Sequence, residues 1–86
     1  MEHWVYILED VQDVLKTGLS ADFGKCWSDL KSGEKIVYLR AFSAPFDAAA
    51  HKHLLDDLSL SSVRFLISKD KEKTKILLRV ALSLIQ

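Results

Sequence analysis

Residues 3 to 18 read HWVYILEDVQDVLKTG, two apolar runs separated by a polar stretch. The first run, Trp4 to Leu8, is aromatic and β-branched, which favours a strand. It is apolar on both alternating faces, so we expect this strand to lie inside a sheet. Residues 9 to 13 are polar and Val14 to Leu19 is apolar again, with Gly18 expected to end the second strand. This spacing predicts a β-hairpin with a loop of a few residues.

The apolar spacing changes from that of a strand to that of a helix after Ser20. One helical stripe, at i, i+3, i+4 and i+7, consists of Phe23, Cys26, Trp27 and Leu30. Ser20 or Asp22 can cap its start, and Gly33 suits the left-handed position after its end. A third strand is predicted from Ile36 to Phe42, because the segment is rich in strand formers and Pro45 soon follows.

The second half of the chain predicts helices. A second stripe consists of Phe46, Ala49, Ala50, His53 and Leu54, with Asp47 in the first turn, where a negative charge meets the helix dipole. Residues 58 to 68 fit either a strand or a helix, and we favour a short helix. Residues 70 to 86 predict a last helix, apolar at Ile76, Leu77, Val80, Ala81 and Leu84 and widened by Leu78, Leu82 and Ile85. The chain is therefore predicted to be mixed α and β.

Composition limits the class of protein. The 86 residues suffice for a single domain, expected over residues 1 to 86, and the equal numbers of acidic and basic residues mean that nucleic-acid binding would need a local basic patch. Cys26 is the only cysteine, so we expect no disulfide or zinc site and a cytoplasmic location. We expect no signal peptide and no membrane partner, because the most apolar segment is far shorter than the about 20 residues that span a bilayer.

The order and spacing of these elements resemble the GIY-YIG endonuclease domain, in particular the small stand-alone bacterial type. Trp4-Val5-Tyr6 stands at the first motif and Val5-Tyr6-Ile7-Leu8 matches the first strand of the family, while Lys16-Thr17-Gly18 stands at the second motif. Ile36-Val37-Tyr38 resembles the third strand. The resemblance covers residues 3 to 67 and implies an α/β (α+β) fold, a small three-stranded antiparallel sheet flanked by helices, to which residues 70 to 86 add a C-terminal helix.

The resemblance implies phosphodiester hydrolysis with one divalent metal. In the family a glutamate holds the ion, tyrosines assist deprotonation of water, and an arginine stabilises the phosphate charge. The equivalent positions here are Tyr6, Lys16 for the second tyrosine, Cys26 for the arginine and Lys52 for the glutamate. A lysine cannot hold a cation, so we assign no catalytic residue and no metal ligand, and we expect no cofactor and no ordinary nuclease activity.

Three functions remain as hypotheses. The first is a non-catalytic binding module in which Tyr6, Lys16, Lys25 and Lys52 form a cationic pocket for nucleic acid or an acidic protein. The second is a divergent Mg²⁺-dependent DNA endonuclease that recruits Asp47 or Asp56. The third is an interaction protein that associates through its C-terminal helix, for example as a homodimer.

Other polar and aromatic residues favour structural interpretations. His51 and His53 are two positions apart, so we expect one exposed and one packed histidine rather than a zinc pair. Trp4, Tyr6 and Trp27 are interpreted as core residues rather than as base-stacking surfaces. A basic cluster is interpreted as the solvated start of a helix rather than as a phosphate-binding patch, and consists of Lys69, Lys71, Lys73 and Lys75.

Overall fold

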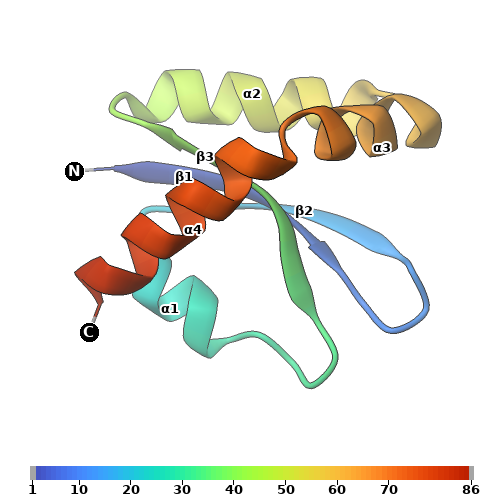
Figure 1. Cartoon of the computed structure of the whole chain (residues 1–86). Helices are drawn as coiled ribbons and strands as arrows, with labels where there is room; N and C mark the ends of the chain where they lie inside the picture. The colour runs from blue at the N-terminus through green and yellow to red at the C-terminus, as the bar shows by residue number, and fades with distance from the viewer. Residues whose placement is uncertain (1, 86) are drawn as a thin grey trace.

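The protein is described by a computed structural model for residues 2 to 85, in which three antiparallel strands form one sheet (Figure 1). The strand order is β2-β1-β3, and the strands are β1 (His3–Glu9), β2 (Leu15–Ser20) and β3 (Lys35–Phe42). The predicted central position of the first strand is confirmed. Because β3 ends the strand order, one of its edges lacks a strand partner.

Four helices cover the sheet, and they are α1 (Phe23–Ser28), α2 (Pro45–Asp57), α3 (Leu60–Lys69) and α4 (Lys71–Leu84). The ambiguous segment after residue 58 is a helix, as favoured, and the Ser59 side chain caps it by accepting from the Ser62 amide. Asp22 caps α1 in the same way. The predicted last helix extends to Gln86, which lies outside the described residues. No helix of residues 2 to 85 has both the length and the apolar character needed to cross a bilayer.

Each face of the sheet carries its own apolar core. On one face α2 and α3 pack on β1 and β3, and the buried residues are Val5, Ile7, Tyr38, Ala48, Leu55 and Val63. On the other face α1 and α4 pack on the same strands, and the buried residues are Trp4, Phe23, Ile36, Leu39 and Ala81. The β1 side chains are thus buried alternately on both sides, which explains the unbroken apolar run of the first strand.

The predicted apolar stripe of α2 faces away from the sheet, whereas that of α4 is confirmed at Leu77 and Ala81 and wrong at Ile76, Val80 and Leu84. On α2 the buried side chains are Ala48 and Leu55, whereas Phe46 is 80% and Leu54 is 54% exposed. On α4 the inward side chains include Leu77, Leu78, Ala81 and Leu82, whereas the outward row consists of Ile76, Val80 and Leu84. Both helices have apolar residues on more than one side, so helical periodicity alone could not identify the packed side.

Gly18 lies within β2, not at its end as predicted, and β2 continues to Ser20. Gly18 pairs with Tyr6 across the hairpin, and the Tyr6 ring lies over it, so that an added Cβ would overlap the ring. Gly33 has the predicted positive φ, +85°, but it lies in the turn before β3, because α1 already ends at Ser28. The first glycine is required by close packing and the second by backbone conformation.

The corner between α3 and α4 crosses the outer edge of β3. Asp70, at this corner, is 7% exposed and forms an ion pair with Arg40 of β3. One turn further along, the buried Thr74 hydroxyl accepts a hydrogen bond from the Leu39 amide at 3.4 Å. The corner therefore satisfies polar groups in the second half of β3 and joins the helices of the two faces (Figure 1).

Candidate functional sites

Tyr6 lies in a small hollow between the hairpin and α1. The hollow, which we call the Tyr6 pocket, has a volume of about 270 Å³, and Lys25 and Cys26 of α1 also line it. Lys25 is exposed, whereas Cys26 is 7% exposed. The structure thus brings together two of the four residues of the predicted cationic pocket, Tyr6 and Lys25.

Burial keeps the Tyr6 phenol protonated. Burial is the largest cause that raises the pKa of Tyr6 to about 12, and the neighbouring Cys26 and Asp29 raise it further. Burial likewise raises the pKa of the Cys26 thiol. Both groups therefore remain protonated at neutral pH, so neither can accept a proton from water there.

Lys16 lies on the same face of the sheet as Tyr6 but contacts a different residue. It pairs with Leu8 in the hairpin register, two residues from the Tyr6–Gly18 pair, so its side chain leaves the sheet on the Tyr6 side. Its Nζ lies 3.7 Å from Oε2 of Glu34. The ammonium group is thus held at the rim of the sheet, and Lys16 does not line the Tyr6 pocket.

Lys52 lies on the opposite face of the sheet. Its Nζ is 2.8 Å from Oδ2 of Asp56, and Asp56 also accepts a hydrogen bond from the Thr17 hydroxyl. Thr17 pairs with Ile7, whose side chain belongs to the core beneath α2 and α3. A single small ligand therefore cannot contact Lys52 and Tyr6 together, because the sheet separates them.

The residues around Lys52 do not fit the divalent metal that the resemblance implies. The ammonium of Lys52 stands where a carboxylate would be needed, and hydrogen bonds from Lys52 and Thr17 lower the pKa of Asp56 and occupy its oxygens. Asp47 lies in the first turn of α2, more than two helical turns before Asp56. Over residues 2 to 85 no three His, Cys, Asp or Glu side chains are grouped closely enough to bind an ion.

A larger hollow opens where α3, α4 and the start of β3 meet. We call this hollow of about 400 Å³ the basic cleft, because four cationic side chains line it, and these are Lys35, Arg64, Lys71 and Lys75. Its apolar lining consists of the partly or fully buried Ile36, Val37, Ile67 and Leu78. The cations are exposed, so the cleft has an apolar floor and a basic rim.

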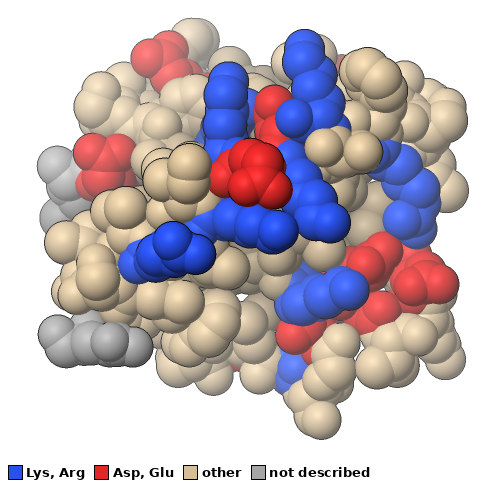
Figure 2. All heavy atoms as spheres, viewed as in Figure 1, with Lys and Arg blue, Asp and Glu red and all other residues tan. Residues whose placement is uncertain are grey.

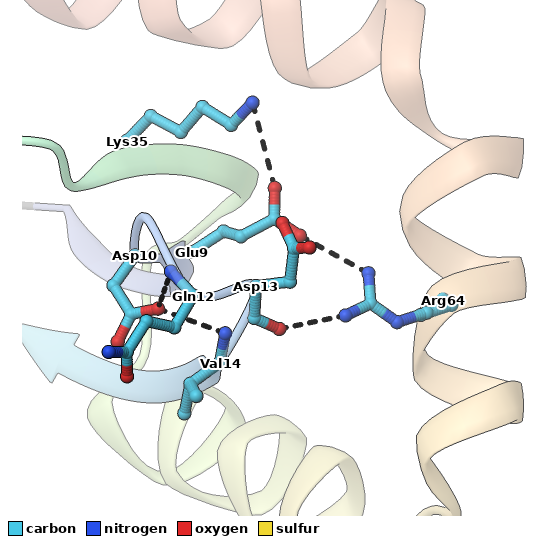
Figure 3. A network of polar contacts seen from close by, with 7 residues as sticks. All are labelled: Glu9, Asp10, Gln12, Asp13, Val14, Lys35 and Arg64. Carbon is cyan, nitrogen blue, oxygen red and sulfur yellow. Dashed lines mark hydrogen bonds and ion pairs between the residues drawn. The ribbon is translucent and has the colours of Figure 1, made fainter.

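Glu9 is the one acidic residue among those that line the basic cleft. Its Oε1 lies 3.6 Å from Lys35 Nζ and its Oε2 lies 3.2 Å from Arg64 Nη1 (Figure 3). Arg64 also donates to the backbone oxygen of Asp13 at 2.8 Å, which ties α3 to the hairpin turn. The Glu9 side chain is only 15% exposed, so these contacts are partly shielded from water.

The other two cations lie on one side of α4 and are more available to a ligand. Lys75 makes a surface ion pair with Glu72 at 3.6 Å, and among the described residues no carboxylate lies within 4 Å of Lys71 Nζ. Exposed ion pairs contribute about 0–1 kcal/mol, so Lys75 can exchange its partner readily. Figure 2 shows Lys and Arg side chains gathered over α4 and continuing towards α3, with acidic side chains both among them and at the hairpin beyond.

Sequence reasoning missed the basic cleft. Lys71 and Lys75 were assigned to a solvated helix start, and neither Lys35 nor Arg64 was singled out. The available signal was the i, i+4 spacing of Lys71 and Lys75, followed by Leu78 at i+7, which places two cations and an apolar residue on one side of a helix. The contributions of β3 and α3 come from distant segments, which the sequence alone does not bring together.

The aromatic and histidine predictions are largely confirmed. Nε2 of His51 lies 2.9 Å from the Tyr38 hydroxyl, whereas His53 is exposed beside Asp57. Trp4 is 6% exposed and belongs to the core. Trp27 stacks on Phe23 at 6.3 Å between ring centroids but remains 39% exposed, so it covers the core rather than filling it.

Comparisons with known proteins identify the fold. No family model matches the sequence, and no curated protein sequence matches it. Among solved structures, the solution NMR structure of a UPF0213 protein from Bacillus halodurans matches with a TM-score of 0.65 and 23% sequence identity, over 83% of this chain and 87% of that one. At this identity the similarity shows the fold alone. This chain therefore shares the α+β fold of that protein, with a three-stranded antiparallel sheet, and the match supports the GIY-YIG-like fold that the resemblance implies.

Proposed function

We propose that this chain is a non-catalytic binding domain that holds an anionic partner, nucleic acid or an acidic protein, in the basic cleft. The observation that carries the proposal is the convergence of four cations from three elements on one hollow, against one carboxylate that already has two partners. Converging charges of one sign attract a ligand of the other sign and fix its position. Tyr6 and Lys25 offer a smaller second contact on the α1 side.

The chemistry at the GIY-YIG positions supports a loss of catalysis. Cys26 is buried and cannot give a phosphate the two hydrogen bonds of an arginine, and Lys52 repels a metal ion. Loss of one electrostatic stabiliser typically costs on the order of 100-fold to 1,000-fold in rate, and loss of the metal removes the main stabilising charge as well. Asp47 and Asp56 are the candidate metal ligands of the endonuclease hypothesis. They are too far apart along α2 to share an ion with a third ligand.

A nicking assay tests the loss of catalysis. Supercoiled plasmid incubated with the protein and Mg²⁺ or Mn²⁺ should remain supercoiled. Nicking that disappears when Tyr6→Phe or Asp56→Asn is introduced would refute a non-catalytic function, because it would place the cut at this chain rather than at a contaminant.

Salt-dependent binding tests the basic cleft. We expect heparin oligosaccharides, used as a generic polyanion, to bind at low salt and to weaken as salt is raised. The Lys71→Glu/Lys75→Glu variant should weaken binding at least tenfold at 50 mM salt, and the log-log salt slope should fall by about 2 because two charge contacts are lost.

The chain offers a matched control for this test. Lys69→Glu/Lys73→Glu changes the net charge by the same amount close to the corner between α3 and α4, but both residues are exposed and neither lines the basic cleft. It should retain most of the binding. Equal losses in the two variants would mean that only overall charge matters, and absence of heparin binding at 50 mM salt would refute the proposed function.

A second candidate function is self-association through α4. Ile76, Val80 and Leu84 lie four residues apart and are 61%, 49% and 71% exposed, so they form an apolar row on the outer side of the helix. Light scattering of the wild type and of Ile76→Glu/Val80→Glu separates the cases. A dimer that the variant dissociates would support this function, and a monomer at millimolar concentration would exclude it.

A further inference from the structure

The basic cleft meets β3 along the open edge of that strand. Three consecutive residues, Lys35 to Val37, line the cleft, whereas the side chains of a regular strand would alternate between the two faces. Val37 has no partner on β1, because the register shifts between Ile7 and Leu8. The main chain of β3 therefore approaches the cleft at this bulge, in the half of the edge that precedes the Thr74 contact with Leu39.

Open strand edges bind extended peptides. An edge presents amide and carbonyl groups that a further strand can pair with, and alternate side chains of the added segment then point to one side. At this edge the aliphatic lining of the cleft flanks both sides, because Ile67 of α3 belongs to the core of one face and Leu78 of α4 to the core of the other. The volume of about 400 Å³ lies within the about 300–1,000 Å³ of ordinary ligand sites, enough for a few aliphatic side chains.

The composition of the cleft favours peptide over nucleic acid. None of the residues that line it is aromatic, so bases would find no ring to stack on. An apolar floor contributes nothing to a phosphate backbone, and the chain as a whole carries no net charge, unlike most nucleic-acid binders. Carboxylates of a peptide, by contrast, complement Lys71 and Lys75 while its aliphatic side chains cover the floor.

We infer that the basic cleft binds an acidic segment of a partner protein in extended conformation, added to the open edge of β3, with aliphatic side chains on the floor and carboxylates against Lys71 and Lys75. The inference rests on the proposed function and narrows its partner to one class. Lys35 and Arg64 already hold Glu9, so they frame the hairpin end of the cleft, whereas the α4 lysines select the charge of the ligand.

The test uses four labelled probes and two-dimensional amide NMR, which detects millimolar binding. The first probe is a nonapeptide in which Val alternates with Glu or Asp. The second replaces each Val by Ser, the third carries N-methyl groups on alternate backbone nitrogens, and the fourth is a 20-nucleotide single-stranded DNA. We expect the first to shift amides of residues 35 to 37 and 71 to 75, and the second and third to bind at least tenfold more weakly.

The charge variants complete the test. Lys71→Glu/Lys75→Glu should weaken the first peptide at least tenfold, and Lys69→Glu/Lys73→Glu should leave it within twofold. DNA binding without peptide binding would overturn the inference and leave the proposed function standing. If neither the peptide nor the DNA binds, the inference and the proposed function are both overturned. The inference would also be overturned if the Ser or N-methyl peptides bind as tightly as the first, or if both charge variants weaken binding equally. Either result would mean that the peptide is held by general charge attraction alone.

Discussion

Replacement of Gly18 by Ala should destabilise the protein through the ring of Tyr6. An added Cβ at Gly18 would overlap the ring carbons and lie 2.5 Å from the Tyr6 Oη, where atoms normally keep about 3.5 Å or more. Its φ is not in the left-handed region, so Ala in place of Gly would otherwise stabilise a strand by about 0.5–1 kcal/mol. Overpacking typically costs about 1–3 kcal/mol, so we expect a net loss of about 1–2 kcal/mol.

A double-mutant cycle identifies the cause. In a Tyr6→Ala background the new Cβ of Gly18→Ala has no ring to overlap. The substitution should then leave the free energy of unfolding unchanged or increase it. In a Tyr6→Phe background the ring carbons remain, so the loss should persist. Urea unfolding gives the free energies, and a loss of about 1–2 kcal/mol corresponds to a fall in Tm on the order of 10 °C for a chain of this size. The same loss in the Tyr6→Ala and Tyr6→Phe backgrounds would show that the ring is not the cause.

Three further predictions concern the turn before β3 and the titrating side chains. Gly33→Ala should cost at least about 1–2 kcal/mol in urea unfolding, because φ is +85° and the new Cβ would meet Val11, and Val11→Ala should recover only the steric part. Burial lowers the pKa of His51 below 6.5, so the unfolded state takes up the proton first as pH falls. The free energy of unfolding should therefore decrease as pH drops below about 6.5. Unfolding measured at a series of pH values should show a weaker pH dependence in His51→Gln. Burial raises the pKa of both tyrosines, that of Tyr6 to about 12, so ultraviolet titration at pH 10 should show less than half of the phenolate signal. The unfolded state then loses its phenolic protons first, so stability should fall above pH 10. Half-ionisation at pH 10 would contradict the burial.

The sequence was most informative for features that depend only on residues within one element. The β1 run was predicted as a central strand because its side chains are apolar in both directions, and the cap at Asp22 and the positive φ of Gly33 follow from local chemistry. The packed side of α2 was not predictable and that of α4 only in part, because Phe46, Leu54 and Ile76 are as apolar as the residues that the sheet buries. The spacing of apolar residues identifies the packed side of a helix only when the other side is polar.

The candidate sites show the same limit at longer range. Tyr6 and Lys25 meet because a hairpin and the next helix are close in sequence, whereas Lys52 belongs to an element that crosses to the other face of the sheet. A motif alignment orders residues along the chain and carries no information about the face on which each one lies. The basic cleft was missed for the complementary reason, since Lys35 and Arg64 are 29 residues apart in the numbering and meet only after α3 folds back beside β3.

The motif residues that this chain shares with GIY-YIG domains have packing roles of their own. Tyr6 covers Gly18, its phenol has a pKa of about 12, and the glycine is needed because the ring occupies the place of a side chain. Thr17 bonds to Asp56 and so attaches β2 to α2. Selection for this sheet alone would therefore retain the tyrosine and the Thr-Gly pair, and it would place no catalytic demand on Cys26 or Lys52. Motif residues of this kind indicate the fold, and evidence for function has to come from surfaces such as the basic cleft, where charges gather that the packing of the sheet does not require.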